Sequence, residues 1–174
     1  MAKEIAEQEE SIIDKVVSVK RVTKVTKGGK RFAFSALVVS GNQQGKIGIA
    51  LGKSRDVSSA IAKALRRAKK ELFSVPLYKT TIPYTVLGKH GASSVLIRSA
   101  SKGTGVIAGG AVRAVMEALG VRDVLAKSIG SANPQNAVKA TIAALKKLRS
   151  AQDIARLRGK TITEIFGEQN VTAA

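Results

Sequence analysis

Two alternating runs on either side of Lys27-Gly28-Gly29-Lys30 constrain the fold of this sequence more than any other feature. Between Lys15 and Val39, apolar and polar residues alternate with a period of two, which is the period of a β-strand with one buried face. A glycine pair between two such runs is typical of a hairpin turn. We therefore predict that the first part of the chain forms a β-hairpin.

A third strand and a helix follow this hairpin. In the run KIGIALGK, Ile47, Ile49 and Leu51 share one face, and the other face carries only glycine and alanine. Such a face leaves room for a close neighbour, most simply the helix expected over residues 54–73. One helix covers only one face of a three-stranded sheet, so the other face must be solvated or bound to a partner.

The second half of the chain mixes short strands with helices. Two strand-like runs flank residues 88–91, and a glycine-rich stretch then leads into a helix over about residues 111–119. Asn133-Pro134 predicts the start of a longer helix, with asparagine as the cap and proline in the first turn. Two short helices are expected near the end, over residues 152–158 and after Thr161, which can form a capping box with Glu164.

These patterns predict two α+β domains. The expected boundaries are a flexible acidic arm over residues 1–14, a first domain over 15–74, a linker over 75–80, a second domain over 81–167, and a disordered tail over 168–174.

The net charge of +18 is the strongest global signal, and it is unevenly distributed. Residues 1–14 carry one lysine and five acidic residues, whereas the remaining 160 residues carry 29 Lys/Arg and 7 Asp/Glu. So much uncompensated positive charge suits a polyanion, which makes nucleic acid the leading partner. An anionic membrane surface is the alternative, although no apolar run is long enough to span a bilayer and no secretory leader is recognisable.

Catalytic and metal-binding chemistry has few candidate residues. The chain has no cysteine and one histidine, His90, so we expect neither a metal site nor a catalytic centre. Gly103-Thr104-Gly105-Val106-Ile107-Ala108 fits a dinucleotide-binding fingerprint, and Asp123 lies 20 residues after Gly103. In that fold the acid stands at the end of the second strand, whereas Asp123 would begin it. We therefore expect a tight strand-to-helix turn and no cofactor.

The tip of the hairpin is the best candidate for nucleic-acid binding. Glycines let backbone N–H groups approach phosphates, and the surrounding cations neutralise them. From charge and turn placement we predict RNA contacts at Arg21, Lys24, Lys27, Gly28, Gly29, Lys30, Arg31, Lys53 and Arg55. The run KRFAFSAL half-matches an RNA-recognition signature but lacks its internal glycine, so Phe32 and Phe34 are expected in the core against the following helix.

Four stretches resemble a known family. VTKGGKRFAFSALVV, KIGIALGKSRDVSSAI, the run from Ala100 to Leu145 and RGKTITEIF are similar to bacterial small-subunit ribosomal protein five, and the resemblance covers about residues 15–167. It implies an α+β fold with an N-terminal domain like those that bind double-stranded RNA, with three strands and one helix, and a C-terminal βαβ-type sheet with helices. The first helix of a standard double-stranded-RNA-binding domain has no counterpart here, so minor-groove reading of a duplex is not expected to carry over.

The resemblance also implies a function. It indicates a non-enzymatic structural constituent of the small ribosomal subunit in the cytoplasm, without a homo-oligomer, that supports translational accuracy. Its implied partners are 16S rRNA, mRNA at the entry channel, and ribosomal proteins three, four and eight. The family loop near the spectinomycin site corresponds to Val22, Thr23, Lys24, Lys27, Gly28 and Gly29, and the contact with protein four corresponds to Gly105 and Arg113.

Two other classes of protein stay open at this point. One is an enzyme that binds a nucleotide phosphate at the glycine loop, because the C-terminal fold implied by the resemblance is similar to that of some small-molecule kinases. Such an enzyme needs acidic residues for Mg²⁺ and for catalysis, and the second half offers few, such as Glu117, Asp123 and Asp153. The other is a protein that binds a membrane surface.

Overall fold

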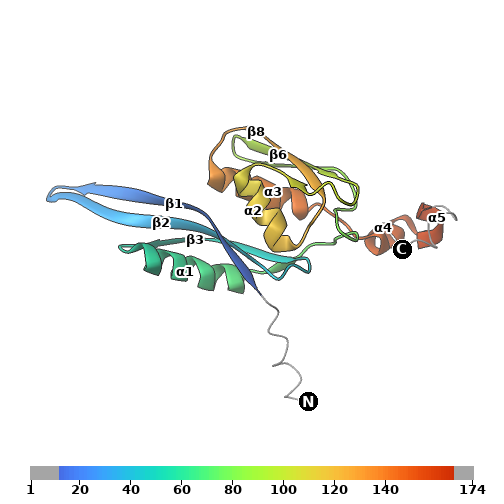
Figure 1. The fold of residues 1–174 in the computed structure, drawn as a ribbon, viewed down its shortest axis with the longest axis horizontal. Coiled ribbons are helices and arrows are strands. Elements are labelled where there is room, and N and C mark those ends of the chain that lie inside the picture. Colours follow the sequence, from blue (N-terminus) through green and yellow to red (C-terminus); the bar gives the residue numbers. More distant parts are fainter. Residues whose placement is uncertain (1–11, 167–174) are drawn as a thin grey trace, which may run out of the picture.

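A computed structural model of the chain describes residues 12–166 (Figure 1). The predicted acidic arm, up to Ser11, and the predicted tail lie outside the described residues. The elements in chain order are β1 (Ile13–Thr26), β2 (Gly29–Gly41), β3 (Lys46–Ser54), α1 (Val57–Lys70), β4 (Phe73–Ser74), β5 (Val86–His90), β6 (Ser93–Ser99), β7 (Val106–Ile107), α2 (Gly110–Leu119), β8 (Val124–Gly130), α3 (Pro134–Leu145), α4 (Ala151–Arg158) and α5 (Ile162–Phe166).

The first sheet has the strand order β1-β2-β3-β4 and is antiparallel throughout. The predicted hairpin is present, with Thr26 paired to Gly29 and a two-residue turn at Lys27-Gly28. Strand β1 begins at Ile13, so the last two residues assigned to the acidic arm belong to the sheet. The two-residue strand β4 was not predicted, because two residues carry no detectable alternation.

Glycines on β3 allow α1 to lie directly on the sheet, as the sequence predicted. A methyl group added to Gly48 would overlap the carbonyl oxygen of Ala68, and one added to Gly52 would overlap that of Ala60. The alanines on α1 are correspondingly buried. This close backbone contact explains why the third strand alternates large aliphatic residues with glycine and alanine.

The second sheet has the order β5-β6-β8-β7 and contains the expected βαβ unit. Strands β7 and β8 are parallel and are joined by α2, whereas the other pairs are antiparallel. Helix α2 ends at Gly120, which adopts a left-handed φ of 93°. The turn between β5 and β6 lies at Gly91-Ala92 and not over residues 88–91, because Gly88 is a strand residue on which α3 packs closely at Ala140 and Ala144.

The starts of α3 and α5 follow the sequence signals, whereas Asp56 at the start of α1 makes no side-chain capping bond. The Asn133 side chain accepts a hydrogen bond from the backbone N–H of Gln135 at 3.1 Å, and Pro134 occupies the first turn of α3. Thr161 and Glu164 exchange the two hydrogen bonds of a capping box at the start of α5. A second capping box, between Ser150 and Asp153, begins α4 and was not predicted.

Helices α2 and α3 lie between the two sheets, so the layers run α1, first sheet, helices, second sheet (Figure 1). Leu37, Val39 and Ile47 of the first sheet belong to the same buried cluster as Val115 of α2 and Val138 of α3. The face of the first sheet that α1 leaves open is therefore covered by the second half of the same chain. The two units share one core, so packing alone does not divide the chain into two domains. The boundary at residues 75–80 stays a prediction.

Backbone contacts and one ion pair fix this junction. The N–H groups of Gln43 and Gly45 donate to the carbonyl oxygens of Ala118 and Leu119, each at 3.1 Å. The Lys15 ammonium on β1 pairs with the Glu117 carboxylate on α2. The end of α2 and the β2–β3 turn are thus held together by main-chain atoms, which leave little freedom for sliding.

Replacing Gly52 with alanine tests the close contact between β3 and α1. The added methyl group has no space against Ala60, so we expect the free energy of unfolding to fall by roughly 1–3 kcal/mol. Gly110→Ala is the control, because nothing lies within 4 Å of the added carbon there, and it should change stability by less than about 0.5 kcal/mol. Denaturant unfolding measures both, and an equal loss in the two variants would contradict the packing described.

Candidate nucleic-acid interface

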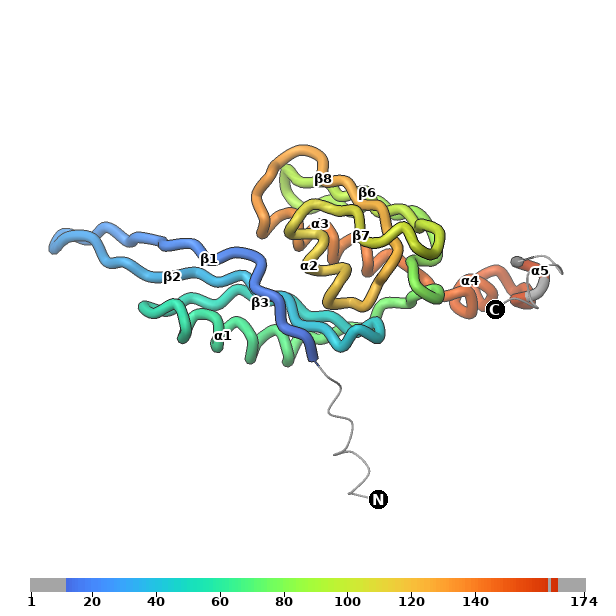
Figure 2. The backbone as a smooth tube through the Cα atoms, in the orientation of Figure 1, coloured from blue at the N-terminus to red at the C-terminus, as the bar shows by residue number. Residues whose placement is uncertain are grey.

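The β1–β2 hairpin projects beyond the rest of the first sheet (Figures 1 and 2). Strand β2 pairs with β3 only as far as Phe34, opposite Ser54, so residues 20–33 have strand neighbours only within the hairpin. We call residues 20–33 the projecting hairpin. It contains six Lys/Arg residues and no Asp/Glu, and the side chain of Val25 at its end is 71% exposed.

The register of the hairpin separates its cations onto two faces. Lys24 lies directly opposite Arg31, and Lys20, Ser35 and Lys53 form a row across three strands on this same face. Like charges directly opposite each other destabilise a sheet unless an anion compensates them. The cations on this face therefore repel one another in the free protein.

Lys20 also lies on this face, although it is not among the predicted RNA contacts. It follows the same alternation as Lys24, so the sequence contained the signal for it. Arg21 and Lys30 lie on the opposite face of the hairpin, the face that α1 covers further along β2. Arg55 is exposed in the connection between β3 and α1. The predicted cations thus surround the hairpin and its base, and they do not form a single patch.

The prediction that both phenylalanines lie in the core is wrong for Phe32. Phe34 is half-buried and packs against the alanine cluster beneath α1, but Phe32 is 49% exposed. The hairpin extends past the start of α1, so no helix reaches the Phe32 ring. The Arg21 guanidinium stacks on that ring instead, with its carbon 4.4 Å from the ring centre.

The turn itself is open. No heavy atom lies within 4 Å of a carbon added to Gly28 or Gly29, and Gly29 has a φ of 121°, which side chains rarely adopt. The Thr26 hydroxyl donates to the Gly29 carbonyl at 3.0 Å and closes the turn. Val22 and Thr23 lie on the exposed stem just behind it.

The glycine loop that resembles a dinucleotide fingerprint is filled by a side chain of the chain itself. The buried Asp123 carboxylate accepts hydrogen bonds from the N–H groups of Gly103 at 2.9 Å and Gly105 at 3.1 Å. Hydrogen bonds from the Thr80 hydroxyl, and then from the Gly105 backbone, lower the pKa of Asp123 below its ordinary value. Asp123 therefore occupies N–H groups that a pyrophosphate would need, and it orders the loop.

The two residues expected at a protein contact lie on either side of β7. Gly105 ends the loop before this strand, and Arg113 is exposed in the first turns of α2. The Arg113 Nε donates to the Glu117 carboxylate at 2.8 Å, and Glu117 also binds Lys15. Hydrogen bonds from Lys15 and then Arg113 lower the pKa of Glu117. Arg113 is thus linked through one carboxylate to the first sheet.

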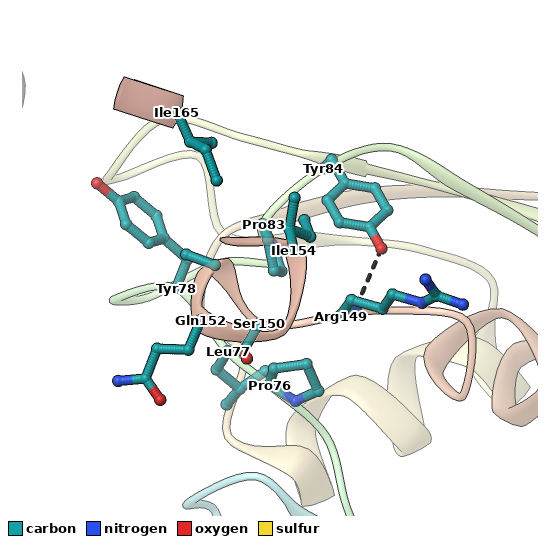
Figure 3. A pocket seen from close by; sticks show the side chains of 11 residues that line it. Pro76, Leu77, Tyr78, Pro83, Tyr84, Arg149, Ser150, Gln152, Ile154 and Ile165 are labelled. Atoms are coloured by element: carbon teal, nitrogen blue, oxygen red, sulfur yellow. Dashed lines mark hydrogen bonds between the residues drawn. The ribbon is translucent and has the colours of Figure 1, made fainter. Parts of the chain in front are cut away.

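A cavity of about 500 Å³ lies between the 76–84 connection and helices α4 and α5 (Figure 3). Its lining is mostly apolar and includes Pro76, Leu77, Tyr78, Pro83, Tyr84, Ile154 and Ile165. The Tyr84 hydroxyl accepts a hydrogen bond from the backbone N–H of Arg149 at 3.0 Å. Among the described residues, no Asp, Glu or His side chain lines this cavity.

Among residues 12–166, no group of three or more His, Cys, Asp or Glu side chains is placed to hold a metal ion. Within the same part of the chain, no helix is long and apolar enough to cross a membrane.

An exposed basic hairpin, together with a glycine loop occupied by an internal carboxylate, characterises an RNA-binding protein and not a nucleotide-dependent enzyme. Two family models match this chain: the N-terminal domain of ribosomal protein S5 over residues 12–76 and the C-terminal domain of ribosomal protein S5 over residues 88–158.

Curated relatives agree with both family models. The small ribosomal subunit protein uS5 of Syntrophobacter fumaroxidans is 54% identical over 154 residues, which cover 88% of this chain and 93% of that protein. Those of Gluconobacter oxydans (50% over 171 residues, 97% and 90%) and Bacteroides thetaiotaomicron (54% over 153 residues, 88% and 89%) are similarly close. The chain belongs to the ribosomal protein S5 family.

Members of this family are structural constituents of the small ribosomal subunit, where they bind RNA and take part in translation. They are not enzymes, which agrees with the expectation drawn from the sequence. The family also accounts for the charge: ribosomal RNA supplies the polyanion that a chain with net charge +18 requires.

Asp123→Asn tests whether the carboxylate holds the glycine loop. Asparagine keeps the shape and loses the charge, so the amides of Gly103 and Gly105 should exchange with solvent about tenfold faster or more. The folded-state pKa of Asp123 lies below its ordinary value of 3.8, so its stabilising contribution is present above that value and is lost as the pH falls through the folded-state pKa.

The difference in unfolding free energy between the natural protein and Asp123→Asn should therefore stay constant from neutral pH to about pH 5 and shrink below about pH 4. Denaturant unfolding at several pH values measures this difference. A difference that grows on acidification would contradict the assignment.

Proposed function

We propose that the projecting hairpin binds 16S rRNA by neutralising its phosphates. The observation that carries this proposal is the pairing of Lys24 with Arg31 directly across the hairpin, with Lys20 and Lys53 further along the same face. No acidic residue occurs between residues 20 and 33 to relieve the repulsion. The turn at Gly28 and Gly29 carries no side chain that would keep a phosphate away from its backbone.

We further propose that Arg21 and Phe32 act as one unit on the other face of the hairpin. The stacked guanidinium and the half-exposed ring present a cation and an aromatic surface side by side. That combination suits a phosphate together with a neighbouring base. Lys27, Lys30 and Arg55 supply further positive charge around the turn and the base of the hairpin.

Membership of the family supports a finer proposal for the role in the ribosome. We propose that the chain lines the mRNA entry channel, supports translational accuracy, and contacts ribosomal proteins three, four and eight in a cytoplasmic ribosome. The loop near the spectinomycin site would comprise Val22, Thr23, Lys24, Lys27, Gly28 and Gly29. An open turn without side-chain neighbours supports this proposal, because substitutions there can change contacts outside the protein without disturbing its core.

The glycine loop and α2 are proposed as the contact with protein four, through Gly105 and Arg113. Gly105 has no neighbour within 4 Å of an added carbon and has a φ of 77°, so its backbone is open to close approach. Asp123 keeps the loop in one conformation. A rigid loop beside an exposed arginine is suited to a contact that opens and closes as a unit during tRNA selection.

The salt dependence of RNA binding tests the role of the hairpin. In the double variant Lys24→Gln/Arg31→Gln, two phosphate contacts are lost, so the slope of log K against log salt should become shallower by about 1.4–1.8. The variant should be at least as stable as the natural protein, because a like-charge pair has been removed. Filter binding to 16S rRNA over a salt series gives the slope.

The control for this experiment is Arg158→Gln/Lys160→Gln. These two exposed cations lie at the end of α4 and just after it, at the opposite end of the molecule from the hairpin (Figure 1). Their neutralisation should change the slope much less. Equal slopes for the two double variants would contradict RNA binding by the hairpin.

Arg113→Glu tests the proposed contact with protein four. If that contact opens when the subunit closes on tRNA, weakening it favours closure, and misreading should rise several-fold in a reporter assay. Arg113→Lys keeps the charge and should stay close to the natural level. Because the new carboxylate would lie one turn from Glu117, thermal unfolding must first show that the variant is folded; a folded variant with unchanged misreading would contradict the contact.

A further inference from the structure

The outer face of the second sheet has no covering layer among the described residues. Helices α2 and α3 lie against its inner face, and no helix or strand lies over the outer one (Figures 1 and 2). Alternation along the strands turns five aliphatic side chains to this outer face: Leu87, Leu96, Ile107, Leu125 and Ile129. Four of them are among the exposed large hydrophobic residues, with Ile107 56% and Ile129 54% exposed.

Three cations lie among these aliphatic residues. The register places Arg98 next to Leu125, Lys127 next to Leu96, and Lys89 next to Ser94, which in turn lies opposite Ile129. No acidic residue points outward from β5, β6, β7 or β8. A shallow depression of about 270 Å³ lies on this face against Leu96, Ile107 and Leu125, with Arg98 and Lys127 at its sides.

We propose that this outer face is a docking surface for a second protein whose own surface combines aliphatic or aromatic side chains with carboxylates. The contiguous apolar side chains need an apolar counterpart to leave water. The cations need opposite charges, and the long stems of Arg98 and Lys127 can lie along the apolar contact while their charged ends reach carboxylates. The depression would receive one anchoring side chain of that partner.

The chemistry of the face selects a protein over RNA. Sheet surfaces that bind single-stranded RNA stack bases on aromatic rings, and the outward positions here are aliphatic, cationic or serine. Against phosphates and riboses the aliphatic residues would stay poorly matched. The cations of the projecting hairpin, by contrast, surround an open glycine turn and the exposed Phe32 ring.

A second copy of this chain is also a poor occupant. Two such faces brought together would oppose Lys89, Arg98 and Lys127 with the same cations of the other copy, without a carboxylate from either. The proposed contact at Gly105 and Arg113 meets this surface only at its β7 edge, because Gly105 directly precedes the strand that carries Ile107. Arg113 lies on α2, which is beneath the inner face of the sheet.

Site-specific photocrosslinking in the assembled small subunit tests the proposal. A photoreactive phenylalanine derivative replaces Leu87 in one full-length variant and Ile129 in another; both positions point outward, so folding should be unaffected. We expect each to crosslink to one protein of the subunit, at peptides that combine apolar residues with Asp or Glu. Crosslinks to rRNA, to peptides without carboxylates, or none above the level of irradiated unmodified subunits would overturn the proposal.

Charge reversal provides a second readout. Arg98→Glu/Lys127→Glu should weaken binding of the protein identified by crosslinking about tenfold or more, and reversing the carboxylates of that protein to lysine should restore it. Arg158→Glu/Lys160→Glu, at the far end of α4, is the matched control and should bind normally. If the first variant is folded by circular dichroism and its binding is unchanged, the proposal is overturned.

Discussion

Helix α2 packs its buried side onto the face of the first sheet that α1 leaves open, and the geometry of the molecule depends on this contact. Leu37, Val39 and Ile47 join Val115 and its neighbours in one cluster, while main-chain hydrogen bonds tie the β2–β3 turn to the end of α2. A chain of two small α+β units thus becomes a single layered body. The hairpin, the glycine loop and the open sheet face are consequently presented in fixed directions, which a structural component of a large assembly requires.

Three of the few acidic side chains of this basic protein form contacts within the protein itself. Glu117 connects Lys15 on the first sheet with Arg113 on α2, Asp14 pairs with Lys69 of α1 at 3.2 Å, and Asp123 binds the glycine loop. None of them lies on the projecting hairpin. Its cations therefore repel each other in the free protein, and the RNA proposed to bind there would remove that repulsion. In this proposal, folding and RNA binding use different charges: the acids organise the junction and the loop, and the cations of the projecting hairpin bind the RNA.

Local patterns predicted much of this fold. Alternation around two glycines gave the hairpin, the Gly48–Gly52 face gave the site of α1, and Asn133-Pro134 gave the start of α3. Features that depend on how distant parts of the chain pack together were not predicted, or were predicted wrongly. Phe32 is exposed because the hairpin extends past α1, which residue spacing does not reveal. Asp123 matches a ribose-binding acid by its spacing, but the fold directs its carboxylate into the adjacent loop. Lys20, by contrast, lies on the same face as Lys24, and the alternation of residues along the strand is enough to predict this position.

Native-state hydrogen exchange tests most directly whether the two units form one body with a shared core. Amide protection is measured for Val38 and Val39 in β2 and for Val95 and Ile97 in β6 while low concentrations of denaturant are increased. If α2 joins both sheets into one cooperative structure, the opening free energies of these amides should merge into one global unfolding with a common dependence on denaturant. Two separate sets of opening free energies, one for each sheet, would contradict this account.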